Sequence, residues 1–138
     1  MVSWDYDAGA YGPTIFVLLR TLEDVKLLSS TFSELAESNG VRIDVERAGT
    51  QLINISRFEL ISDDMPVKKR LKRVDDGPGF EWRCTQDQWG IAAALLEPFL
   101  AGSTGHQYLT QENVDDALVE VSYGEEHVGR AEHQNRRG

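Results

Sequence analysis

The stretch AGSTGHQYLTQENVDD, residues 101–116, contains the side chains best suited to chemistry in this sequence. His106 lies in a glycine turn, Tyr108 follows it, and several acids come a few residues later. An imidazole close to carboxylates can be held in one tautomer and can act as a general base. The stretch could therefore be a catalytic loop, a metal-binding loop, or an acidic patch for a basic partner.

A small hydrolase-like enzyme that uses His106 is one function to consider. The rest of the chain offers no nucleophile with an activating context, and it contains neither a G-x-S-x-G elbow nor an H-E-x-x-H helix. The single cysteine, Cys84, alternates with Phe80 and Trp82, which predicts a buried and unreactive thiol on a strand. We therefore expect that the protein is not an enzyme. His106 would instead hold its loop through hydrogen bonds to backbone carbonyls, with Tyr108 half-buried against the sheet.

Two groups of carboxylates could bind a divalent cation. Glu112, Asp115 and Asp116 form one group, and Asp63 and Asp64 form the other. Neither group has the alternating spacing of a calcium loop. The tail histidines at 127 and 133 lie in a polar segment where a metal site would need costly ordering. The sequence predicts no metal site and no cofactor, and its GPGF turn lacks the lysine of a phosphate-binding loop.

Charge is distributed unevenly along the chain of 138 residues, whose formal net charge is −9. Residues 84–124 contain six acids and no lysine or arginine, whereas residues 66–83 contain six bases and three acids. A segment without bases leaves a negative surface unless the basic run folds over it. We expect this protein to be repelled by nucleic acid and attracted to a basic protein surface.

We expect the acidic surface to lie around the loop after GHQYLT and the second predicted helix. A turn that precedes a half-buried strand is a surface position, so its acids should stand in solvent. The predicted partner-binding residues are Asp87, Glu97, His106, Tyr108, Glu112, Asp115 and Asp116.

Hydrophobic periodicity predicts the elements that would position these residues. Residues 13–20 read as a buried strand, and 21–39 as an amphipathic helix with Thr21 as its N-cap. Alternation predicts strands at 41–48 and 51–62, and a slip in parity near Ser56 or Arg57 indicates a bulge or a break. The basic run at 68–74 predicts an edge strand or loop, and strands are expected at 80–85 and 117–123. Residues 86–101 form the second helix, which Pro98 should kink or end.

The order of these elements predicts an α+β fold, a two-layer sandwich of one mostly antiparallel sheet with two helices on one face. The domain should span 13–124, after an N-terminal segment at 1–12 and before a disordered tail at 125–138. No apolar run approaches the ~20 residues of a membrane span, and no secretory signal is expected at the N-terminus. We expect a cytoplasmic protein that does not enter membranes.

A small acidic α+β chain with Trp89 in a late helix, the GHQYL stretch at 105–109 and the SYGE stretch at 122–125 resembles the immunity proteins of bacterial polymorphic-toxin and contact-dependent inhibition systems. The resemblance implies a protein that binds its cognate toxin and blocks the toxin's active site. A nuclease toxin would suit an acidic inhibitor, because carboxylates can take the place of phosphates in a basic cleft. An adaptor subunit that docks through a sheet edge remains an alternative, and the oligomeric state stays open.

Overall fold

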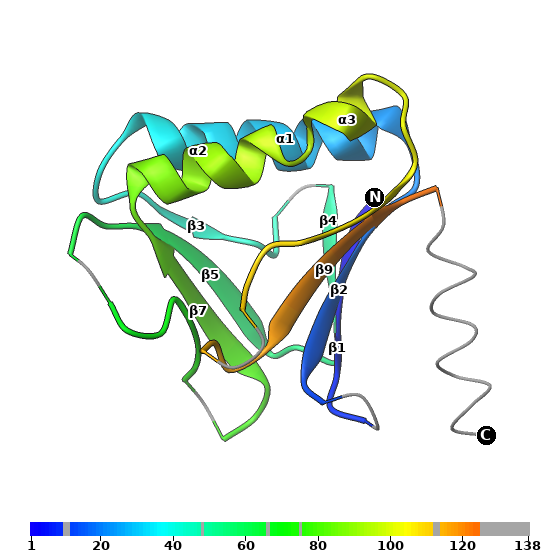
Figure 1. Ribbon diagram of the computed structural model, residues 1–138. Helices are drawn as coiled ribbons and strands as arrows, with labels where there is room; N and C mark the ends of the chain where they lie inside the picture. Colours follow the sequence, from blue (N-terminus) through cyan, green and yellow to red (C-terminus); the bar gives the residue numbers. More distant parts are fainter. Residues whose placement is uncertain (10–11, 48, 66, 75, 112–113, 125–138) are drawn as a thin grey trace.

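The computed structural model describes residues 1–9, 12–47, 49–65, 67–74, 76–111 and 114–124, and it shows an α+β protein. The tail at 125–138 and Glu112 lie outside the described residues. In Figure 1 the helices lie together above two sheets, with strands β5 and β7 of one sheet on the left and strands β2 and β9 of the other on the right. Within the described ranges, no helix is both long and apolar enough to cross a membrane.

The strands form two mixed sheets, so the expectation of one mostly antiparallel sheet is wrong. Neighbours β1 and β4, β2 and β9, and β5 and β7 run parallel, and the remaining pairs are antiparallel. Local periodicity could not predict this pairing, because parallel neighbours are not consecutive in the chain.

Sheet A has the order β4-β1-β2-β9-β8, with β1 (Val2–Asp7), β2 (Thr14–Leu19), β4 (Thr50–Ile53), β8 (Gly105–Tyr108) and β9 (Leu118–Tyr123). Sheet B has the order β3-β5-β7-β6, with β3 (Arg42–Asp44), β5 (Arg57–Ser62), β6 (Leu71–Arg73) and β7 (Gly79–Cys84).

The first residues of the chain belong to the fold. Residues 1–12 were expected to precede the domain, but β1 pairs with both β2 and β4 inside sheet A. Val2 and Trp4 are fully buried in the hydrophobic core. Their side chains alternate with Ser3 and Asp5, so one face of β1 supplies the core while the other carries polar groups.

The parity slip predicted near Ser56 or Arg57 is a break at which the chain passes from one sheet to the other. Strand β4 ends at Ile53 in sheet A, and β5 begins at Arg57 in sheet B. Asn54, between them, has φ of 58°, in the left-handed region that asparagine tolerates better than most residues. The change of parity therefore reflects a corner at which inward and outward faces are exchanged.

Both long helices begin with the capping box that their sequences contain. Thr21 and Asp24 cap α1 (Leu22–Glu37), and Thr85 and Gln88 cap α2 (Gln86–Ala94). The second predicted helix is divided, because α3 (Glu97–Leu100) follows α2 after a short interruption. Pro98 explains the division: it has no N–H to donate to the carbonyl four residues earlier, and it is tolerated in the first turn of α3.

Aromatic side chains join the helices to sheet B and join the two sheets to each other. The Phe32 ring of α1 lies 5.9 Å from the Trp82 ring and 5.5 Å from the Trp89 ring, and the Trp82 and Trp89 centroids are 4.9 Å apart. The sheets meet where Trp4 of β1 contacts Phe58 of β5 at 4.9 Å. The strand predicted to be buried at 13–20 is confirmed as buried, and the core includes Ile15, Val17, Phe32, Phe80, Trp82 and Val121.

We expect replacement of Trp82 by alanine to lower the free energy of unfolding by roughly 3–5 kcal/mol, because it removes an indole that is 1% exposed and touches two other rings. Urea denaturation followed by circular dichroism measures this loss. Ile91→Ala is the control, since Ile91 is 62% exposed and its truncation should cost under about 1 kcal/mol. Similar losses for both variants would contradict the central position of Trp82.

Candidate functional site

His106 and Tyr108 lie on β8, an edge strand of sheet A, so the expectation of a loop at GHQYL is wrong. The segment forms a strand because Gln107 and Leu109 are partly buried and the backbone pairs with β9. His106 is directly opposite Ser122, and Tyr108 is opposite Glu120. Both rings are exposed on the same face, and their centroids are 5.3 Å apart.

This face brings a histidine, a serine and a glutamate onto two adjacent strands. Ser122 is 4% exposed, and its hydroxyl donates to Glu120 Oε2 at 3.5 Å, the outer limit of a hydrogen bond. Activation of a serine nucleophile requires the hydroxyl to donate to a base at about 2.6–3.2 Å. The long contact to a carboxylate does not provide that activation, so the arrangement does not by itself make His106 a catalytic base.

Asp115 is buried, so the expectation that it stands in solvent is wrong; it is 8% exposed. Its Oδ1 accepts the backbone N–H of Arg70 at 2.9 Å and of Leu71 at 3.0 Å, while its Oδ2 accepts that of Gln111 at 2.9 Å. Leu71 begins β6, the last strand of sheet B, and Arg70 immediately precedes it. Asp115 therefore supplies the acceptors that a further strand would otherwise provide.

Asp116 completes the same edge. Its Oδ2 accepts the N–H of Arg73 at 2.8 Å, its own N–H donates to the carbonyl of Leu71 at 3.0 Å, and its Oδ1 lies 2.6 Å from Lys69 Nζ. Burial raises the pKa of this carboxyl, but the Lys69 ammonium and the Arg73 amide outweigh that effect and hold the pKa below its ordinary value of 3.8. The basic run thus neutralises the acidic loop, and these two acids are not an open docking patch.

In the second group of carboxylates, Asp63 is paired with a cation, whereas Asp64 is exposed. Asp63 accepts a backbone hydrogen bond from Met65 and forms an ion pair with Arg83, and these contacts hold its pKa below the ordinary value. Among the residues with described positions, no three His, Cys, Asp or Glu side chains are placed to hold a metal ion together. Carboxylates in salt bridges and backbone hydrogen bonds would have to give up those contacts to bind a cation.

Asp87 and Glu97 differ from the loop acids, because both are exposed on the helical layer. Asp87 lies in the first turn of α2, and Glu97 begins α3. Neither forms a salt bridge with any residue in the described part of the chain. Ile91, one turn beyond Asp87, is 62% exposed, and Leu100 of α3 is 37% exposed. Sequence reasoning missed Ile91 as a surface residue, although its position outside the apolar stripe of Trp89, Ala92 and Leu96 was a usable signal.

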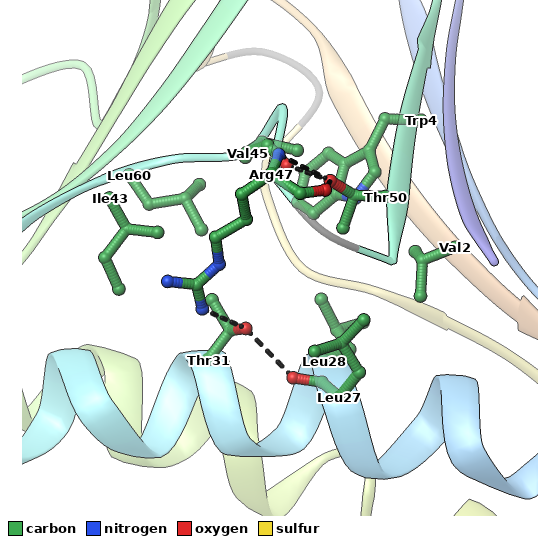
Figure 2. A pocket seen from close by; sticks show the side chains of 10 residues that line it. All are labelled: Val2, Trp4, Leu27, Leu28, Thr31, Ile43, Val45, Arg47, Thr50 and Leu60. Atoms are coloured by element: carbon green, nitrogen blue, oxygen red, sulfur yellow. Dashed lines mark hydrogen bonds between the residues drawn. The ribbon is translucent and has the colours of Figure 1, made fainter.

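An apolar cavity between α1 and the start of sheet A is shown in Figure 2. Its wall includes Val2, Trp4 and Leu28, and Arg47 and Thr31 lie at one side. The Arg47 guanidinium donates to the Thr31 hydroxyl at 3.0 Å. The free space suffices for about one water molecule, so this cavity is too small for an organic substrate.

Cys84 is buried as expected, at 4% exposure. Burial raises the pKa of its thiol to about 12, even though the neighbouring Arg70 guanidinium acts in the opposite direction. The thiol is therefore protonated at neutral pH, and a protonated thiol is a poor nucleophile.

No protein-family model matches this chain, and neither a curated protein nor a solved structure matches it.

Replacement of Asp115 by alanine should lower the free energy of unfolding by about 2–3 kcal/mol, because backbone donors at a buried strand edge lose their acceptor. Chemical denaturation measures the loss, and amide hydrogen exchange should become faster at Leu71. Asp87→Ala is the matched control and should change stability by less than about 0.5 kcal/mol. Equal effects of the two substitutions would show that Asp115 does not close the edge.

Asp116 should contribute to acid unfolding. A carboxyl whose pKa is lower in the folded than in the unfolded protein stabilises the fold above the unfolded pKa, and this contribution is lost as pH falls through the folded pKa. We expect Asp116→Asn to be less stable at pH 7 and to lose less stability than the parent protein below about pH 4. Urea denaturation at pH 7, 4 and 3 tests this. Parallel stability curves for the two proteins would contradict it.

Proposed function

We propose that this chain is an inhibitory binding protein of the immunity type, which docks a basic partner, such as a nuclease toxin, through the exposed surface of α2 and α3. The main support is that Asp87 and Glu97 are exposed there without an ion pair from the described residues, whereas Asp115 and Asp116 are committed to β6. The proposed acidic docking surface is therefore centred on α2 and α3, and not on the loop after GHQYLT.

Exposed apolar side chains on the same two helices fit the same purpose. Ile91 and Leu100 are both exposed large hydrophobic residues on the helices that bear the acids. Protein interfaces commonly combine a desolvated apolar centre with a polar rim, and the centre supplies most of the affinity. We infer that the helices form one layer over both sheets, which leaves the outward face of α2 and α3 open to a partner (Figure 1).

The charge of the whole chain supports the choice of a basic partner. With a net charge of −9 and no lysine or arginine in residues 84–124, the field around α2 and α3 attracts cations. The basic run is held at the edge of sheet B, where Lys69 pairs with Asp116. A toxin with a basic substrate cleft would meet carboxylates where it otherwise binds phosphates.

The function can be tested by expressing the product of the adjacent reading frame in a bacterial host, with and without this chain. We expect the neighbouring product to stop growth and this chain to restore it by direct binding. Growth arrest that the chain does not relieve, or a neighbouring product without toxicity, counts against the proposal. A turnover activity of this chain that is abolished by His106→Gln would favour the enzyme alternative instead.

The docking surface is tested by reversing Asp87 and Glu97 to lysine together. Exposed charges act mainly on association, so we expect the association rate with the toxin to fall about tenfold or more at low salt, with a weaker salt dependence. Surface plasmon resonance at two salt concentrations measures both quantities. The matched control reverses Glu46 and Asp64, which are exposed elsewhere and change the net charge equally. Equal effects of both double variants would exclude a specific role for α2 and α3.

A further inference from the structure

The outer face of sheet A is buried at its centre, although the helices and sheet B lie against the inner face (Figure 1). The inner face supplies Trp4, Ile15 and Val17 to the hydrophobic cluster between the sheets and the helices. Side chains alternate along a strand, so Phe16 and Leu18 of β2 point away from that cluster. They are only 5% and 4% exposed, yet they are not members of the cluster that the described residues form. Their burial therefore requires a cover on the outer face.

The strand registers place two rows of side chains across this outer face. One row contains Gln51, Ser3, Leu18, Ser122 and His106, and the other contains Ile53, Asp5, Phe16, Glu120 and Tyr108. The middle of each row is buried, whereas His106 and Tyr108 at the β8 end are exposed. A desolvated centre with an open rim is typical of a docking site. The occupant must cover β1 and β2 and leave β8 open.

Asp5 indicates the chemistry of the occupant. Its side chain is 1% exposed, and its Oδ1 accepts a hydrogen bond from Asn54 Nδ2 at 3.3 Å. A buried carboxylate needs a cation or strong donors around it, because its loss of hydration is costly. Glu120 adds a second, partly buried acid to the same row. We therefore expect an occupant with cationic side chains, and with apolar ones that pack on Phe16 and Leu18.

The chain itself continues into a segment of this composition. Strand β9 ends at Tyr123 between β2 and β8, and Gly124, with φ of 79°, ends the extended conformation. Residues 129–138 contain three arginines and one glutamate, and Val128 and Ala131 are apolar. The stretch 125–138 can reach ~46 Å when extended and ~21 Å as a helix, whereas five neighbouring strands span ~19 Å. The segment is therefore long enough to cross the sheet in either form.

We propose that residues 125–138 dock on the outer face of sheet A, with an arginine of the segment paired to Asp5 and its apolar side chains on Phe16 and Leu18. A guanidinium suits this place, because it can donate to a carboxylate through more than one N–H group. The contact would stabilise the buried acid and keep two apolar side chains out of water. This proposal replaces the expectation of a disordered tail. It does not depend on the proposed docking of a basic partner, which uses α2 and α3.

A nitroxide label on the segment tests where the segment lies. Gln134→Cys provides the attachment point, since the native thiol of Cys84 is buried and its pKa is raised to about 12. We expect the label to broaden the nuclear magnetic resonance signals of the Leu18 methyl groups. Ile61 is the internal control, because it is also buried, at 2% exposure, but lies on the outer face of sheet B. Equal broadening at Leu18 and Ile61, or none at Leu18, would overturn the proposal.

A second copy of the chain is the competing occupant. Spin-labelled protein without isotopes is mixed with isotope-labelled protein without the nitroxide, so that only contacts between copies broaden a signal. We expect the Leu18 signals to stay sharp in this mixture. Broadening there would place the segment of one copy on the face of another and would rule out the intramolecular contact.

Asp5→Asn should release the segment, because it removes the counter-charge and keeps the shape of the side chain. We expect trypsin to cleave at the arginines of the segment about tenfold faster, since cleavage follows the population of the undocked form. Asp64→Asn is the matched control, as the exposed Asp64 loses the same charge elsewhere. Circular dichroism and thermal unfolding check that both variants fold. Equal cleavage rates in the two folded variants would contradict the role of Asp5.

Discussion

Two carboxylates close the edge of one sheet, and much of the structure depends on them. Asp115 and Asp116 accept the outward N–H groups of β6 that no neighbouring strand can pair with. They belong to the segment that leads directly into β9 of sheet A, so the same contacts tie the two sheets together. An unprotected edge invites pairing with other chains. The uneven charge of the sequence has this structural cause, because the basic run and the acidic loop are partners.

The aromatic core determines which surfaces remain for function. Trp4 and Phe58 join the sheets, and Phe32, Trp82 and Trp89 join the helices to sheet B. Side chains that take part in this packing cannot move to meet a partner without a large loss of stability. Side chains at the outside of the helical layer, such as the exposed Ile91, take no part in this packing.

Local features of the fold could be predicted from the sequence, whereas long-range pairing could not. The N-cap at Thr21, the buried strand around Trp82 and the break before Arg57 all depend on neighbouring residues, and they were predicted. The parallel pairing of β2 with β9 depends on residues about a hundred positions apart, which no local pattern reveals.

The candidate site shows the same contrast between features set by nearby residues and features set by distant ones. Asp87 and Glu97 were expected on the acidic surface, and both are exposed because of their places on helices. Asp115 was expected in solvent because its segment looks like a polar turn. It is instead buried, and it accepts a hydrogen bond from Leu71 of β6, which is 44 residues away in the sequence. Burial of an acid by backbone donors from a distant strand leaves no periodic signal. His106 is likewise placed on a strand only because β9 is there to pair with it.

The position of β9 in sheet A has a consequence for how the chain acquires its structure during synthesis. Strand β2 is central, and one of its edges is paired by Leu118–Tyr123 alone. Until that strand leaves the ribosome, β2 has an open hydrophobic edge, and β6 still lacks Asp115 and Asp116. Both sheets are thus completed by the same short stretch of chain, and pairing between such distant segments is intrinsically slow. The nascent chain must therefore remain incompletely folded until almost all of the described domain has been translated, a period in which it would rely on protection from aggregation.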